Sequence, residues 1–223
     1  MVALFGLDMP FTRAAFSSAT PELLSRGARF KPAVWRWGGE VTVVVKDVRD
    51  LPFWSRPLAR WLLDRERRIM LRLSGLEAFP QVLAELDRDA FVIDLLPGQP
   101  LTQEAFLCAP REITTRFQTQ IQQMHARGVF HLDLRQRQNI LLDGEQPYLI
   151  DFGAAFSPNW LGRKIWGPLM RWVDRMAPLK YLARWAPQEL SADEIRLVRR
   201  TQRLRKFWLL SPNNPDGEDV VGR

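Results

Sequence analysis

Hydrophobic residues follow a strand pattern most clearly in residues 33–48, which read AVWRWGGEVTVVVKDV. Two runs rich in valine and tryptophan flank Gly38-Gly39, and a two-residue Gly-Gly connection is typical of a β-hairpin. Successive side chains of a strand point to opposite faces, so Lys46 shares a face with Val44. The pattern therefore predicts two paired strands, the second of which places a lysine at the end of a mostly apolar face.

A second pattern, with apolar residues every three or four positions, predicts two long helices. The first covers residues 56–73. The second covers residues 111–127, and Gly128 follows it where a left-handed helix cap is expected. Between them, the apolar residues 90–96 predict a strand that leads into a Pro-Gly loop. This part of the chain thus changes from strands to helices.

Two short apolar runs at residues 139–142 and 148–150 predict a further pair of strands, and the chain beyond them reads as basic helices. The order predicts an α+β fold with two lobes. A small β-rich N-lobe with one helix would cover residues 1–97, and a mainly helical C-lobe would cover residues 98–210. The tail at residues 211–223 is rich in proline, asparagine and glycine, which predicts disorder.

The composition is that of a globular protein with an anionic partner. Of the 223 residues, 46% are hydrophobic and 26% are charged, which excludes a disordered, collagen-like or disulfide-framework protein. The 32 basic and 25 acidic residues give a net charge of +7, which favours a nucleotide, phospholipid, anionic glycan or nucleic acid. The chain lacks signal-peptide features and membrane-spanning stretches, and Cys108 is its one cysteine, so we expect a cytoplasmic protein.

The clearest chemistry lies in residues 124–156, which read MHARGVFHLDLRQRQNILLDGEQPYLIDFGAAF. Asp133, Asn139 and Asp151 offer carboxylate and amide oxygens, which suit a hard cation such as Mg²⁺ better than zinc. Phosphoryl transfer needs such a cation, a carboxylate that orients the attacking hydroxyl, and positive charge near the phosphates. The residue types are therefore those that phosphoryl transfer requires.

The amino-acid sequence of this segment resembles that of the protein-kinase-like superfamily. The letters HLDL at residues 131–134, followed by Asn139, resemble its catalytic loop, and the letters DFG at residues 151–153 match its metal-binding element. The resemblance implies a two-lobed kinase-like fold in which Asp133 is the catalytic base, while Asn139 and Asp151 hold Mg²⁺.

Further positions acquire roles from the same resemblance. Lys46 falls where a lysine contacts the α- and β-phosphates of ATP, and Glu66 is its expected ion-pair partner, with Asp64 as the alternative. Arg135 would offset charge on the γ-phosphate, and Leu141 would form the floor of the adenine pocket. The implied cofactors are ATP and Mg²⁺.

Three departures from the kinase pattern change the expectation. One extra residue separates Asp133 from Asn139, so Gln138 occupies the usual asparagine position, but Asn139 is favoured because it directly precedes the apolar run ILL. No glycine-rich loop is present, so a degenerate loop near residues 25–31 must cover the phosphates. About 70 residues follow the DFG letters, which is few for a peptide-docking lobe and favours a non-peptide acceptor.

The letters HLDLRQRQN narrow the resemblance to bacterial small kinases related to lipopolysaccharide-core (Kdo/heptose) kinases, with RIO-type kinases as broader neighbours. The similarity covers about residues 28–156. It implies an ATP- and Mg²⁺-dependent kinase that phosphorylates a sugar hydroxyl of lipopolysaccharide core or a related glycolipid. A protein serine/threonine kinase is the first alternative. A non-catalytic, nucleotide-binding pseudokinase module is the second, because the glycine-rich loop is missing.

Residues 159–185 form a basic, tryptophan-rich region that reads NWLGRKIWGPLMRWVDRMAPLKYLARW. Its apolar residues recur at helical spacing, so one interpretation is a packed lobe helix with a solvated basic face. The other is a peripheral surface that contacts the inner face of the cytoplasmic membrane through anionic lipid headgroups, or a phosphorylated glycolipid. The residues expected to form that surface are Trp166, Trp172, Arg163, Lys164 and Arg171. Nucleic acid is the least favoured partner because no groove-reading motif is present.

Overall fold

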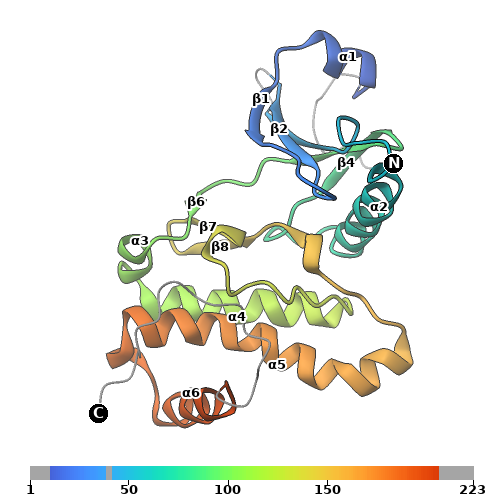
Figure 1. Ribbon diagram of the computed structural model, residues 1–223. Helices are drawn as coiled ribbons and strands as arrows, with labels where there is room; N and C mark the ends of the chain where they lie inside the picture. Colours follow the sequence, from blue (N-terminus) through green and yellow to red (C-terminus); the bar gives the residue numbers. More distant parts are fainter. Residues whose placement is uncertain (1–10, 39–41, 206–223) are drawn as a thin grey trace. The chain divides into compact units, whose positions relative to one another are not determined.

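The structure of the protein, a computed structural model, describes residues 11–38 and 42–205 (Figure 1). Its described residues divide into two compact units. The first, called here the sheet unit, comprises Met1–Pro97 and Ile150–Ala155; the second, called the helical unit, comprises Gly98–Leu149 and Phe156–Arg223. The three DFG residues therefore belong to the sheet unit, although the strand before them and the long helix after them in the sequence do not.

The sheet unit is built on one five-stranded antiparallel sheet with the strand order β1-β2-β3-β5-β4. Its elements are α1 (Arg13–Ser18), β1 (Glu22–Ser25), β2 (Ala33–Trp37), β3 (Val43–Asp47), α2 (Arg56–Arg72), β4 (Val82–Asp87), β5 (Ala90–Asp94) and the short 3₁₀-helix η2 (Phe152–Ala154). Every residue of β3 is buried, because the strand lies in the middle of the sheet with helices near both faces. This burial explains why its sequence VVVKD is apolar over three successive residues.

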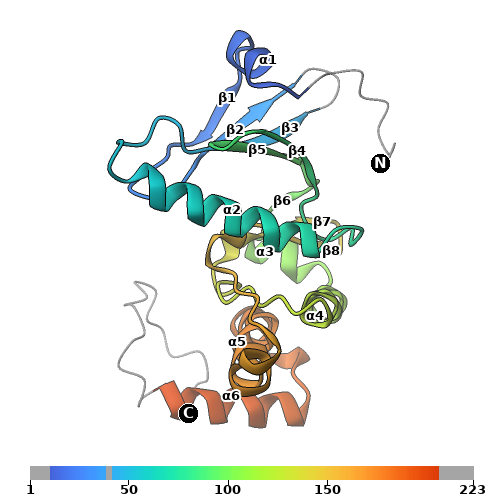
Figure 2. The same ribbon diagram turned by 90° about the vertical axis from the view of Figure 1, so that its right-hand side faces the viewer.

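Different helices cover the two faces of this sheet (Figure 2). On one face Phe16 of α1 packs against Trp37, with 5.4 Å between ring centroids, and Val45 joins the same buried cluster. The helix α2 covers the other face, where Lys46 of β3 contacts Glu66. The alternation of side chains along β3 thus sends valines to α1 and the lysine to α2.

The helical unit combines a small three-stranded sheet, in the order β6-β7-β8, with three longer helices. Its elements are β6 (Gln99–Pro100), α3 (Gln103–Leu107), α4 (Pro110–Ala126), η1 (Arg137–Asn139), β7 (Ile140–Asp143), β8 (Gln146–Leu149), α5 (Trp160–Trp185), η3 (Pro187–Glu189) and α6 (Ala192–Arg205). Phe117, Ile121 and Met124 line the fully buried face of α4. The helices α4 and α5 lie side by side, and α6 packs against α5 (Figures 1 and 2).

The predicted elements form with small shifts at their ends. The predicted long helices are α2 and α4, and both begin with a proline in the first turn, where its missing N–H costs nothing. Gly128 has a φ of 72° just after α4, as a left-handed helix cap requires. The expected hairpin strands β2 and β3 pair antiparallel, whereas Gly39 of the expected turn and the expected disordered tail at residues 211–223 lie outside the described residues.

Candidate active site

A buried ion pair joins Lys46 of β3 to Glu66 of α2 within the sheet unit. The Lys46 ammonium donates a hydrogen bond to a Glu66 carboxylate oxygen, and both side chains are less than a tenth exposed. Burial opposes the charge on Lys46, but the attraction of Glu66 and of Asp151 outweighs it and raises the pKa of Lys46. Asp64, the alternative partner, instead pairs with two arginines of its own helix. The arrangement holds a charged lysine in the interior of the unit.

The DFG segment is anchored to α2 and to the core of the sheet unit. Phe152 is fully buried, and its ring lies 6.1 Å from that of Phe79. The Arg65 guanidinium on α2 donates a hydrogen bond to the carbonyl oxygen of Gly153. Asp151 has an exposed side chain, whose Oδ1 accepts a hydrogen bond of 3.3 Å from the Gly153 N–H. The anchored neighbours therefore present the Asp151 carboxylate to solvent.

The predicted catalytic loop lies in the helical unit, and there Asn139 contacts Asp133. Asn139 is buried, and its side-chain amide donates hydrogen bonds of 3.0 Å to the backbone oxygen of Asp133 and to its Oδ2. Gln136 donates to both carboxylate oxygens of Asp133, at 3.1 and 3.0 Å. Gln138 is exposed and donates a hydrogen bond of 2.8 Å to the side-chain oxygen of Gln136. The extra residue of the loop is taken up by the 3₁₀ turn Arg137–Asn139, which turns Asn139 inward.

A residue that the sequence did not single out fixes the backbone of this loop. Asp174 of α5 is 1% exposed, and its carboxylate accepts hydrogen bonds from the backbone N–H groups of His131 at 2.9 Å and Leu132 at 2.7 Å. The same carboxylate lies 2.9 Å from Nε2 of His125. Its one signal in the sequence is that it is the sole acidic residue between positions 159 and 185.

Two further side chains of α5 support the next turn of the loop. The buried Tyr181 hydroxyl lies 3.2 Å from the carbonyl oxygen of Leu134 and 2.9 Å from that of Arg135. Burial, reinforced by the negative charge of Asp133, raises the pKa of Tyr181. The hydroxyl therefore stays protonated and donates a hydrogen bond to these carbonyl oxygens. Lys180 donates to the Arg135 carbonyl oxygen at 3.1 Å, and the Arg135 side chain itself is exposed.

Backbone strain marks the same segments. Among the described residues, the non-glycine residues with positive φ are Arg29 at 55°, Leu132 at 66° and Asp151 at 62°. Such a conformation costs about 1–3 kcal/mol and persists where the surroundings impose it, often at functional sites. Leu132 lies in the predicted catalytic loop, Asp151 begins the DFG letters, and Arg29 lies in the loop predicted to cover the phosphates.

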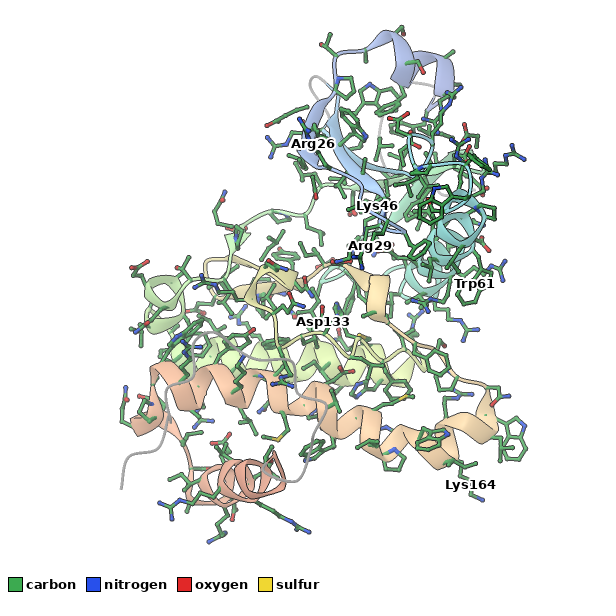
Figure 3. All side chains as sticks on the ribbon, in the orientation of Figure 1. Arg26, Arg29, Lys46, Trp61, Asp133 and Lys164 are labelled. Carbon is green, nitrogen blue, oxygen red and sulfur yellow. The ribbon has the colours of Figure 1, made fainter. Side chains whose placement is uncertain are left out.

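The connection between β1 and β2 is tight and cationic. Lys31 donates a backbone hydrogen bond of 2.8 Å to Ala28, and a Cβ on Gly27 would come within 3.0 Å of the Lys31 oxygen. The side chains of Arg26, Arg29 and Lys31 are exposed around this turn, and Figure 3 labels the two arginines together with Lys46. The loop thus offers guanidinium and ammonium groups where a glycine-rich loop would offer backbone N–H groups.

The oxygen donors of this chain fit Mg²⁺ better than a softer metal. The amide nitrogen of Asn139 is engaged by Asp133, which leaves its side-chain oxygen as the group that can bind a metal. The Asp151 carboxylate is exposed and accepts a hydrogen bond from the Gly153 N–H through Oδ1, so Oδ2 can bind a metal. In the part of the chain that the structure describes, no three His, Cys, Asp or Glu residues gather closely enough to hold a metal. Mg²⁺ in proteins usually binds one or two carboxylates and keeps water or phosphate oxygens as its other ligands.

Comparison with known proteins supports the fold. No family model matches the sequence, and no curated protein matches it. Among solved structures, the chain is similar to that of a Rio2 kinase from Chaetomium thermophilum in a complex described as ADP/Mg²⁺-phosphoaspartate, with a TM-score of 0.59 and 19% identity. The match covers 80% of this chain and 60% of the Rio2 kinase chain. The chain has a protein-kinase-like fold.

This kinase-like fold confirms the predicted α+β class, with an antiparallel N-lobe sheet and a helical C-lobe. The likeness to a RIO-type kinase is borne out at the level of the fold, while the narrower resemblance to lipopolysaccharide-core kinases is not confirmed. Leu141, the predicted adenine-pocket residue, is half-buried on β7 between Pro100 and Tyr148 of the adjacent strands.

Proposed function

We propose that the protein is an ATP- and Mg²⁺-dependent phosphotransferase that acts on an acceptor hydroxyl. The buried Lys46–Glu66 pair carries the proposal, because taking two charges out of water is costly and rarely serves stability alone. On a protein-kinase-like fold, such a pair serves to hold a lysine for the phosphates of ATP. The N-lobe would extend over residues 1–97 and the C-lobe over residues 98–210, with the DFG residues attached to the N-lobe.

In the sheet unit, Lys46 would contact the α- and β-phosphates while Glu66 keeps it charged and in place. The cationic turn around Arg29 would cover the phosphates in place of a glycine-rich loop. Arginine binds phosphate oxygens through two parallel hydrogen bonds, so a turn of this kind compensates for missing backbone donors.

In the helical unit, Asp133 would accept the proton of the acceptor hydroxyl. Gln136 and Asn139 hold its carboxylate in one orientation, which is what a general base needs. The exposed guanidinium of Arg135 would offset charge on the γ-phosphate, and Leu141 would contact the adenine. Asn139 and Asp151 would hold Mg²⁺, which when bound neutralises the negative charge of the phosphates.

The acceptor that we favour is a sugar hydroxyl of lipopolysaccharide core or a related glycolipid. The support is the small C-lobe, which after Ala155 consists mainly of α5 and α6, and the basic character of α5. A protein serine or threonine hydroxyl is the alternative acceptor. The absence of a glycine-rich loop favours a second candidate function, a pseudokinase that binds nucleotide without turnover.

Transfer from γ-labelled ATP decides among these functions. Purified Kdo-containing core oligosaccharide and a generic protein substrate are offered in parallel, with and without Mg²⁺. We expect label on the oligosaccharide only when Mg²⁺ is present. Label on protein alone would favour the alternative acceptor, and thermal stabilisation by ATP without transfer to any acceptor would favour the pseudokinase.

The extra residue of the catalytic loop yields a prediction on the metal requirement. Replacing Asn139 with Ala removes a proposed metal ligand. We expect the Mg²⁺ concentration for half-maximal turnover to rise by about tenfold, which is the lower end of the loss of metal affinity seen when residues that support a metal site are replaced. Gln138→Ala is the matched control and should leave the Mg²⁺ dependence unchanged, because Gln138 is exposed. Mg²⁺ titration of turnover measures both, and the opposite ranking of the two variants would mean that Gln138 holds the metal.

The ion pair yields a second prediction, on catalytic efficiency. Glu66→Gln keeps the shape of the side chain but removes its charge, and hydrogen bonds to charged groups contribute about 1.5–3 kcal/mol. If Lys46 contacts the phosphates, kcat/KM for ATP should fall roughly ten- to hundredfold. Asp64→Asn, on the same helix but paired with neighbouring arginines, should have little effect. An unchanged kcat/KM in Glu66→Gln would remove the pair from the catalytic machinery.

A further inference from the structure

The first half of α5 exposes more large apolar side chains than a packed lobe helix does. Five of them stand in ten successive residues, each at least 40% exposed: Trp160, Leu161, Ile165, Trp166 and Leu169. Scattered single apolar residues on a surface need no explanation, but a contiguous group marks an interaction site. We call these five residues the α5 apolar stripe.

Three of the five residues, Leu161, Ile165 and Leu169, face away from the interior of the helical unit, whereas Trp160 and Trp166 lie at other angles around the helix and are still exposed. Asp174, on the same helix, is buried and bonds to the catalytic-loop backbone, so its direction marks the packed side of α5. Ile165 precedes Asp174 by nine residues, which at about 100° per residue places it about 180° around the helix. Leu161 and Leu169 lie one turn before and one turn after Ile165 on the same side. The structure leaves the predicted Trp172 and Arg171 half-buried, with the Arg171 guanidinium over the Phe130 ring. The exposed apolar residues that stand with Trp166 are instead Trp160, Leu161, Ile165 and Leu169.

Cations accompany the stripe and acidic residues do not. Arg163 and Lys164 are exposed on the same turns of α5, Arg163 with its guanidinium next to Gly128, and neither has an ion pair with another residue in the described part of the chain. The one carboxylate of residues 159–185, Asp174, is turned inward and already engaged. The exposed surface of this part of α5 therefore combines apolar side chains with positive charge.

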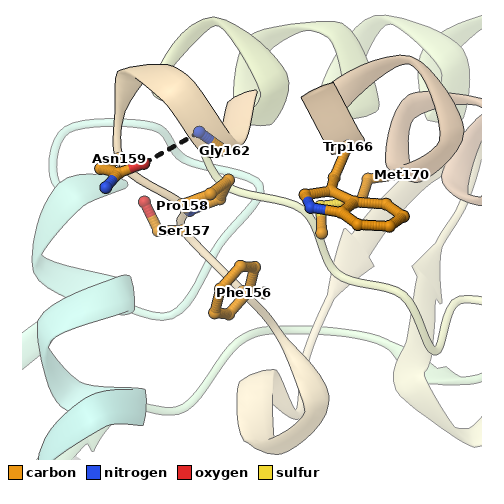
Figure 4. A pocket seen from close by; sticks show the side chains of 7 residues that line it. All are labelled: Phe156, Ser157, Pro158, Asn159, Gly162, Trp166 and Met170. Carbon is orange, nitrogen blue, oxygen red and sulfur yellow. Dashed lines mark hydrogen bonds between the residues drawn. The ribbon is translucent and has the colours of Figure 1, made fainter. Parts of the chain in front are cut away.

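A hollow opens next to the stripe. It has a volume of about 460 Å³ and is lined by Phe156, Ser157, Pro158, Asn159, Gly162, Trp166 and Met170. Figure 4 shows that Phe156 enters it from the segment before α5 and Trp166 from α5 itself. Mainly apolar side chains line it, so the apolar surface continues beyond the helix.

We propose that the first half of α5 docks the protein on an anionic phospholipid membrane, with the helix lying in the plane of the headgroups. Indole rings settle at the boundary between headgroups and acyl chains, and flanking lysine and arginine attract anionic lipids. Within the described residues, none of the helices has the length and apolar character needed to span a bilayer. A nucleic acid would use the cations but not the apolar stripe, and a second copy of this chain would bring the same positive charge to the interface. The bilayer alone satisfies both features, and the proposal holds whether or not the protein transfers phosphate.

Vesicle co-sedimentation of the full chain tests the proposal. The probes are vesicles of phosphatidylcholine alone and of equal parts phosphatidylcholine and phosphatidylglycerol. We expect binding to the anionic vesicles only, a blue shift of tryptophan fluorescence on binding, and weaker binding as salt screens the charges. Each basic residue near an anionic surface contributes about fivefold in binding, so Arg163→Gln with Lys164→Gln should weaken binding roughly 25-fold.

Matched variants separate the surface from general effects of charge and apolar exposure. Ile165→Ser with Trp166→Ser should reduce the fluorescence shift, leaving Trp160 as the remaining tryptophan of the stripe, and weaken binding by at least about tenfold. The controls are Trp61→Ser on α2, an equally exposed tryptophan, and Arg199→Gln with Arg200→Gln on α6; neither should change binding. Absence of binding to anionic vesicles would overturn the proposal, as would equal losses in the controls. Concentration-dependent dimers that Ile165→Ser dissolves, or oligonucleotide binding that replaces vesicle binding, would equally overturn it.

Discussion

Replacing Asp133 with Asn is expected to lower kcat for phosphoryl transfer by about 10²- to 10⁴-fold, the range that a general base contributes. Asn cannot accept a proton from the acceptor hydroxyl, although it fills the same space. Asp133 is half-buried, and Gln136 and Asn139 can rotate their amides to meet the new side chain. The free energy of unfolding should therefore change much less than kcat does, and ATP should still bind.

The control for this variant is Asp143→Asn, which removes an exposed carboxylate at the end of β7 in the same unit. Single-turnover kinetics and a thermal unfolding curve on both variants separate chemistry from stability. If kcat of Asp133→Asn equals that of the wild type, the base lies elsewhere. If the substitution lowers the unfolding temperature strongly as well as kcat, the carboxylate stabilises the loop rather than taking part in the reaction.

Sequence patterns predict the elements that local residues determine. The hairpin strands, α2 and α4 follow from periodicity, and their ends follow from proline and glycine. The patterns do not predict α1, which has only six residues and depends on distant contacts. Arg13 at its start pairs with Asp47 and Asp87, and Phe16 packs on Trp37. A helix this short is unstable alone, so its one local signal, the N-cap Thr12, is not enough to predict it.

The strand β4 is missed for a different reason. Its pairing with β5 is irregular between Val82 and Ala84 and again between Glu85 and Asp87. Each irregularity interrupts the alternation of inward and outward side chains, which is the signal that identifies a strand in a sequence. The strand is thus defined by its partner β5 rather than by its own pattern.

The candidate site likewise has some features that the sequence predicts and others that only the fold reveals. The resemblance to kinases implies the pairing of Lys46 with Glu66, and the apolar run after Asn139 favours that residue over Gln138. The partners that hold the catalytic loop, Asp174 and Tyr181, lie more than 40 residues away from the groups that they bind. Only the fold brings them together, although the isolation of Asp174 among basic residues is a usable hint.

Hydrogen bonds to Asp174 of α5 explain why the catalytic loop keeps a strained backbone. Leu132 has a left-handed conformation, and its N–H donates to Asp174 at 2.7 Å. A hydrogen bond to a buried carboxylate is stronger than one to a neutral acceptor, so it offsets the cost of the strained φ. The direction of Asp133, one residue later, depends on this peptide geometry. Asp174 is therefore a positioning residue for the proposed base.

Asp174→Ala is expected to destabilise the protein more than any other single substitution at the site. The change leaves two backbone N–H groups and His125 without their acceptor in the interior, and each unsatisfied group costs about 1–3 kcal/mol. The free energy of unfolding should fall by about 3–6 kcal/mol on this basis. Asp174→Asn keeps one acceptor oxygen and should lose about half as much. Urea denaturation measures both.

Asp193→Ala provides the matched control, because this carboxylate of α6 is exposed and its pairing with Arg196 adds little. It should change the free energy of unfolding by less than about 0.5 kcal/mol. The positioning role has its own readout in Asp174→Asn, which should fold. There kcat should fall while the KM for ATP stays near the wild-type value, because the loop loses its alignment and the nucleotide keeps Lys46. If Asp174→Ala is as stable as the wild type, the loop holds its strained backbone without α5. If Asp174→Asn has a normal kcat, the orientation of Asp133 does not depend on the Asp174 carboxylate.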